Sequence, residues 1–230
     1  MGVTPSRLLF HLCAMLSCEQ MRKWPNMLWG IGSAILSGVL TALATSLEPY
    51  WWAAWLATIP LLIVTFRSSY GETWLWVAIA TLIGLAGKAS YDVMFLGLAG
   101  EAVVALVSVA GVGIVVTLTR AMVQRRRHML AIFFYPAAVA GLGTIVAAVS
   151  PHGTAGSLAY SQMKFLPAIQ IAALAGAAGI VFTIALFAAL VAIAWHCRAE
   201  RPMPWAAYAP RGAVDPGDRS WTEYQVTRYH

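Results

Sequence analysis

The chain has 230 residues, of which 60% are hydrophobic and only 10% are charged, and its mean hydropathy is +0.72. A soluble domain of this length does not tolerate so little charge, so the composition indicates an integral membrane protein. The net charge of +6 does not indicate a nucleic-acid partner, because the basic residues cluster in short loops between apolar segments, where they act as topology signals. Three cysteines, Cys13, Cys18 and Cys197, lack metal-ligand spacing, and the sequence predicts neither a metal nor a cofactor.

Residues 1–23 form an N-terminal segment of their own. The apolar part, residues 8–17, is only ten residues long and too short to cross a bilayer. We interpret the segment as an interfacial helix or as the product of a mis-assigned start codon.

Residues 24–197 are predicted to form an all-α bundle of six transmembrane helices. The first span lies in the 24 uncharged residues between Lys23 and Glu48. Hydroxyl side chains recur along it at every fourth position, and this face is expected to pack against another helix: Ser33, Ser37, Thr41 and Thr45. A tryptophan-rich turn at Tyr50–Trp55 then leads into a second span that ends before Arg67.

The third span, about residues 73–95, contains charges. Lys88 and Asp92 are four residues apart, which places them on one helix face, and Glu101 follows across a short turn. Ionisable residues in a membrane segment are costly and suggest function. Two readings stay open: Lys88 and Asp92 neutralise each other near the interface while Glu101 lies in the headgroups, or the three residues line a polar path.

The last three spans are separated by basic and polar loops. The fourth ends at Arg120, and the fifth, about residues 129–149, is kinked or begun by Pro136. The sixth, about residues 165–195, has small residues four apart, which predicts close helix packing along Ala172/Gly176 and Ala175/Gly179. Residues 198–230 are polar and contain several prolines, typical of a disordered tail.

Charge distribution predicts the orientation. With six spans, 13 of the 15 basic residues fall on one side, and only Lys88 and Lys164 fall on the other. Both termini are therefore expected in the cytoplasm, and the loop of residues 150–162 outside. The predicted location is the cytoplasmic (inner) membrane.

Several short motifs resemble the membrane domain of apolipoprotein N-acyltransferase over residues 28–195. They are Pro136, Pro151, Tyr160-Ser161-Gln162, Gln170-Ile171-Ala172, Gly176, Gly179, the run Trp51–Trp55, and Ile59-Pro60-Leu61-Leu62. The resemblance implies lipid-facing or substrate-facing roles for Tyr160, Ser161, Gln162, Gln170 and His152. It departs from the family pattern at Gly143 and Val146, where an acidic residue and an arginine are common, and at His152, which replaces a tryptophan after the loop proline.

Members of that family carry a Glu, Lys and Cys in a nitrilase-like domain outside the membrane, and we expect no such domain in this chain. All three cysteines are predicted on the cytoplasmic side, so no outward nucleophile is expected. The leading hypothesis is a lipid- or lipoprotein-handling scaffold that is not catalytic alone, with phospholipid, a lipoprotein or a separate nitrilase-like subunit as partners. The alternatives are a small transporter that uses Lys88, Asp92 and Glu101, and a truncated or split acyltransferase.

Overall fold

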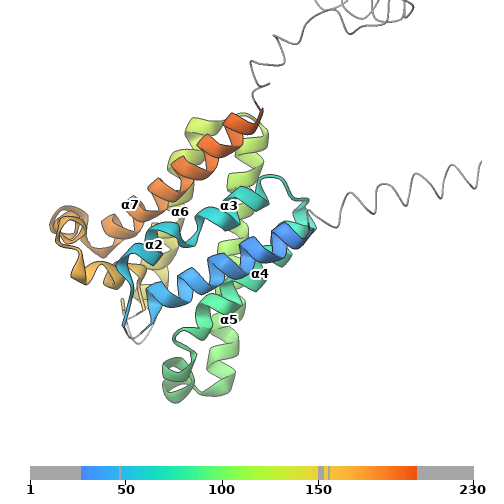
Figure 1. The fold of residues 1–230 in the computed structure, drawn as a ribbon. Helices are drawn as coiled ribbons and strands as arrows, with labels where there is room; N and C mark the ends of the chain where they lie inside the picture. Colours follow the sequence, from blue (N-terminus) through green and yellow to red (C-terminus); the bar gives the residue numbers. More distant parts are fainter. Residues whose placement is uncertain (1–26, 47, 150–152, 155, 201–230) are drawn as a thin grey trace, which may run out of the picture. The chain divides into compact units, whose positions relative to one another are not determined.

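A computed structural model describes residues 27–46, 48–149, 153–154 and 156–200. The regular elements follow one another along the chain (Figure 1): a first helix Met27–Thr45, α2 Trp51–Ala57, α3 Ile59–Thr65, α4 Tyr70–Ala86, α5 Ala89–Gln124, α6 His128–Val149, the short 3₁₀ helix η1 Leu158–Lys164 and α7 Leu166–Glu200. The part of the chain that the structure describes contains no strand, which confirms the all-α class. The chain divides into one compact unit that ends at His196 and a second from Cys197 onward.

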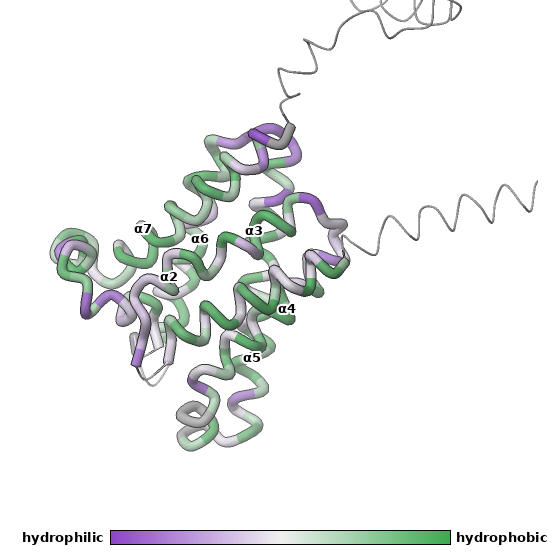
Figure 2. Tube along the Cα trace, in the orientation of Figure 1, coloured by the Kyte–Doolittle hydropathy of each residue, from purple (hydrophilic) through white to green (hydrophobic). Residues whose placement is uncertain are grey.

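Four of these helices are long and apolar enough to cross a membrane: Met27–Thr45, Gly97–Gln124, His128–Val149 and Leu166–Arg198. The second and third predicted spans correspond to shorter apolar helices, at Trp51–Thr65 and Tyr70–Ala86. Six spans therefore remain a prediction, whereas a multi-pass helical membrane protein is established by the elements themselves. Figure 2 shows apolar residues along most of each helix and polar residues concentrated at helix ends.

The hydroxyl-bearing face of the first helix packs against other helices, as predicted. The buried Ser37 hydroxyl donates to the carbonyl oxygen of Ala57 in α2. A Cβ added at Gly84 of α4 would lie 2.9 Å from Thr41 Cγ2, and one added at Gly87 would lie 2.6 Å from the Ala42 carbonyl oxygen. Small residues thus allow the backbones of the first helix and α4 to approach closely.

Helices α2 and α3 form one rod with a single interruption at Thr58, and Pro60 occupies the first turn of α3, where its missing N–H costs nothing. The alanines of α2 are fully buried in a core that also includes Ile184 of α7 and Leu40 of the first helix. The alanine face of the tryptophan-rich segment therefore packs in the core, whereas Trp51 and Trp52 remain exposed.

The predicted third span is wrong in its C-terminal boundary. Helix α4 ends at Ala86, and Lys88 has non-helical angles (φ −125°, ψ 1°) at the start of α5. Lys88 and Asp92 therefore do not lie on one continuous helical span, because Lys88 is the N-cap residue of the helix that contains Asp92. Helix α5 is itself interrupted at Gly97, where φ is +69°.

The sixth predicted span is also divided. Ala175 and Gly176 have non-helical angles inside α7, and Gly176 adopts φ +63° and ψ −162°, a conformation that only glycine adopts without strain. The small-residue pairs that cross this break, Ala172/Gly176 and Ala175/Gly179, consequently do not lie along one regular helix face. By contrast, α6 is continuous through the buried Pro136, so this proline lies inside the helix and does not begin it.

Candidate functional site

The candidate site is built around the side chain of Gln162, which is fully buried in η1. Its Oε1 atom accepts a hydrogen bond from Trp55 Nε1 at 3.0 Å. Its Nε2 atom donates to the carbonyl oxygen of Trp51 at 2.9 Å and to Ser161 Oγ at 2.8 Å. Ser161 Oγ in turn donates to the Leu158 carbonyl oxygen at 2.7 Å. We call Trp51, Trp55, Ser161 and Gln162 the Gln162 network.

This network joins two segments more than 100 residues apart in the sequence. Its polar atoms are buried, so each hydrogen bond is stronger than in water and each loss leaves a costly unpaired group. Aromatic contacts support it: Trp51 stacks on Phe165 with ring centroids 4.7 Å apart, and Trp55 meets the edge of Phe187 at 5.5 Å. The network fixes the position of η1 against the N-terminal end of α2.

The turn before η1 brings a lysine to the site. Gly156 has φ +84°, and a Cβ built there would lie 3.6 Å from Lys88 Nζ. Lys88, between α4 and α5, therefore lies against the polar loop. Ser157 then begins η1, with its hydroxyl accepting from the Ala159 N–H at 3.3 Å. The ammonium group and the loop's hydroxyls together offer donors suited to a carbonyl or phosphate oxygen.

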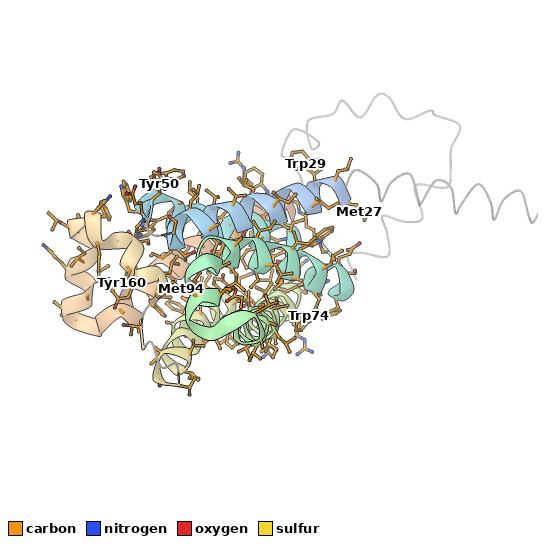
Figure 3. All side chains as sticks on the ribbon, turned by 90° about the horizontal axis from the view of Figure 1, so that it is seen from below. Met27, Trp29, Tyr50, Trp74, Met94 and Tyr160 are labelled. Atoms are coloured by element: carbon orange, nitrogen blue, oxygen red, sulfur yellow. The ribbon has the colours of Figure 1, made fainter. Side chains whose placement is uncertain are left out.

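Tyr160 is the exposed member of the predicted motif, and its hydroxyl lies 2.7 Å from Thr154 Oγ1. Figure 3 shows Tyr50 and Tyr160 at one end of the first helix and Met27 and Trp29 at the other. Gln170 is exposed on the part of α7 before the break. Tyr160 and Gln170 are thus accessible to a ligand, whereas Ser161 and Gln162 are buried and position the loop.

The remaining predicted residues are dispersed. Glu101 is half-buried in α5, one turn after the Gly97 break. Asp92 lies near the start of α5, but its side chain lies outside the described part of the structure, as does all of His152. Among the described residues there is no cluster of ligands that fits a metal ion.

Sequence reasoning missed two features. Trp51 and Trp55 were interpreted as membrane-interface residues, but they contact Gln162, and nothing in the local pattern indicates this long-range pairing. Arg120 was counted only as a charge that ends a span, but its side chain is 5% exposed. The local sequence gives little signal of this burial, because Leu118 is exposed whereas Val123 is buried.

The helical bundle with its polar loop defines a multi-pass membrane protein. Comparison with protein families matches residues 37–190 to the apolipoprotein N-acyltransferase N-terminal domain. The match includes α2 to η1 and most of α7, and the chain belongs to this family. No curated protein and no solved structure matches the chain.

Proposed function

We propose that this chain is a membrane module for lipoprotein N-acylation in a bacterial cytoplasmic membrane, and that it handles lipid or lipoprotein without catalysing acyl transfer alone. Membership of the family supports a role in this process. The observation that carries the proposal is the Gln162 network, which holds a polar loop with an exposed tyrosine beside Lys88.

The proposed ligand is a diacylated polypeptide or a phospholipid at the surface of the membrane. Such a molecule presents carbonyl and phosphate oxygens at headgroup depth and acyl chains below it. Lys88 and the hydroxyl of Tyr160 supply donors, and the exposed Met163 and Leu166 beside them supply apolar contact. The acyl-transfer step itself is assigned to a separate nitrilase-like subunit.

Photo-crosslinking tests this proposal. The purified chain in nanodiscs is exposed to a diacylated lipopeptide with a photoactivatable group, and crosslinked residues are mapped by mass spectrometry. We expect crosslinks in η1 and the first turns of α7. Gln162→Leu, which unpairs the Trp55 N–H, should remove them, whereas Gln124→Leu, an exposed glutamine in the last turn of α5, should retain them.

Equal crosslinking of the same peptide without its acyl chains would contradict the proposal. So would lipopeptide crosslinks that are insensitive to Gln162→Leu. The transporter hypothesis predicts a different result, an ion-dependent flux in proteoliposomes that Asp92→Asn abolishes. We favour the lipid-handling role because Lys88 lies against the loop, outside α4 and before α5.

A further inference from the structure

A buried arginine lies at the opposite end of the α2–α3 rod from Gln162. Arg120 Nε donates to the carbonyl oxygens of Thr65 and Ser68, each at 3.0 Å, and its Nη2 also donates to Ser68. Thr65 is the last residue of α3, and its carbonyl oxygen also accepts the Ser68 N–H at 3.3 Å, so the guanidinium adds a second donor at the end of this helix. This accounts for two of its three nitrogen atoms.

The third nitrogen, Nη1, is buried and has no hydrogen-bond partner among the described residues. No carboxylate in that part of the chain forms an ion pair with Arg120, and the Tyr70 ring centroid lies 4.2 Å from its Cζ. A buried cation without a counter-ion is unfavourable unless an anion reaches it. Carbonyl oxygens and the Tyr70 ring stabilise part of this charge, and Nη1 remains as an unpaired donor.

The same guanidinium lies at the N-terminal end of α4, a 17-residue helix. Ser69 and Glu72 form a capping box, in which Glu72 Oε2 accepts from the Ser69 N–H at 2.7 Å. Gly71, in the first turn, is exposed, and a Cβ built there would meet no atom within 4 Å. The helix dipole and this open space favour an anion beside Arg120.

Other cations lie near this location in the sequence. Arg67 precedes Ser68, and an exposed basic run follows the end of α5: Arg125, Arg126 and Arg127. Figure 2 shows hydrophilic residues at the ends of long apolar helices. Basic residues next to membrane-spanning helices attract the phosphate groups of anionic lipids.

We propose that Arg120 and the N-terminus of α4 bind a phosphate group, from either an anionic phospholipid headgroup or a soluble phosphate. The phosphate displaces the exposed ring of Tyr70 and accepts a charge-assisted hydrogen bond from Arg120 Nη1. This site is distinct from the Gln162 network and does not depend on the proposed function.

The test measures binding of phosphatidylglycerol and phosphatidylcholine to the full chain in mixed micelles. Gly71→Asp adds a carboxylate in the first turn of α4, where a Cβ meets no atom within 4 Å, and it keeps the residues that bind Arg120. We expect it to weaken phosphatidylglycerol binding roughly tenfold or more, and to raise the melting temperature in the absence of this lipid. Leu98→Asp is the matched control, because it adds the same charge at an exposed position at the other end of the helix Gly97–Gln124 from Arg120, and it should bind as the wild type does.

Arg120→Gln is the second variant and should also weaken binding, although it removes helix-end contacts. Competition with inorganic phosphate distinguishes the sources: a headgroup site is unaffected by millimolar phosphate, whereas a soluble-phosphate site is displaced by it. Equal binding of the two lipids, together with no binding of inorganic phosphate, would overturn the proposal. It would also be overturned if Gly71→Asp bound phosphatidylglycerol as tightly as Leu98→Asp did.

Discussion

Trp55 donates its indole N–H to Gln162 Oε1 at 3.0 Å, across 107 positions of the sequence. The same glutamine binds the Trp51 carbonyl oxygen, so one side chain connects η1 to two successive turns of α2. Because the side chain is buried, its replacement leaves polar groups without water to compensate them.

Loss of this contact should be measurable as a loss of stability. Gln162→Leu is expected to lower the free energy of unfolding by about 1–3 kcal/mol, since it unpairs the indole N–H of Trp55 and removes one of the donors to the Trp51 carbonyl oxygen. Trp55→Phe keeps an aromatic ring but removes the donor, and it should cost a similar amount. Thermal unfolding in detergent measures both variants, and the double variant should cost less than the sum of the two. Additive effects would show that the two side chains are not coupled.

The break in α7 gives a second prediction. Gly176 has φ +63° and ψ −162°, so Gly176→Ala should lower stability by about 1–3 kcal/mol. The matched control is Gly143→Ala in α6, where a Cβ meets no atom within 4 Å and the backbone is helical. That control should be neutral or stabilising by up to about 1 kcal/mol. If both alanine variants unfold at the same temperature, α7 is a continuous helix in the protein.

The orientation of the chain gives a third prediction. Lys88 and Lys164 are the two basic residues that are predicted on the opposite side of the membrane from the other 13. Lys88 lies against Gly156, and Lys164 lies in η1, so the structure places both lysines at the same end of the bundle. Ser157→Cys should therefore react with a membrane-impermeant maleimide added to intact cells. Arg211→Cys should react only after the cells are opened. Labelling of Arg211→Cys from outside would overturn both the six-span topology and the predicted cytoplasmic tail.

The isolated chain is expected to show no acyltransferase activity. Of the three cysteines, Cys197 is the one among the described residues, and it follows His196 in the last turns of α7. The distribution of basic residues predicts this thiol on the cytoplasmic side, where it does not reach an extracytoplasmic substrate. Purified protein with phospholipid and a diacylated lipopeptide should yield neither an N-acylated product nor a thioester. Product formation that persists when all three cysteines are replaced by serine would reveal a nucleophile that we have not located.

Composition and local spacing were sufficient to predict the helical membrane class and the packing face around Ser37, whereas the Tyr160-Ser161-Gln162 motif was indicated by the family resemblance. They did not predict the breaks at Gly97 and Gly176, because an isolated glycine in an apolar run is equally compatible with close helix packing. The roles of Lys88 and Arg120 depend on which distant backbone atoms they reach. Such contacts arise from the tertiary structure and leave little local pattern.

The break at Gly176 also limits how deep the chain can lie in a bilayer. From Ala177 to Arg198, α7 has 22 residues, or roughly 33 Å, close to the thickness of a hydrocarbon core. Backbone groups released by the break need water or protein partners, which the core does not supply. A matching bilayer therefore places the break at its boundary, with the strongly exposed Leu174 beside it in the lipid. In a thicker bilayer the break would lie inside the hydrocarbon core. The segment of α7 before the break, which carries Gln170, would then be the first part of the chain to rearrange in response to the hydrophobic mismatch.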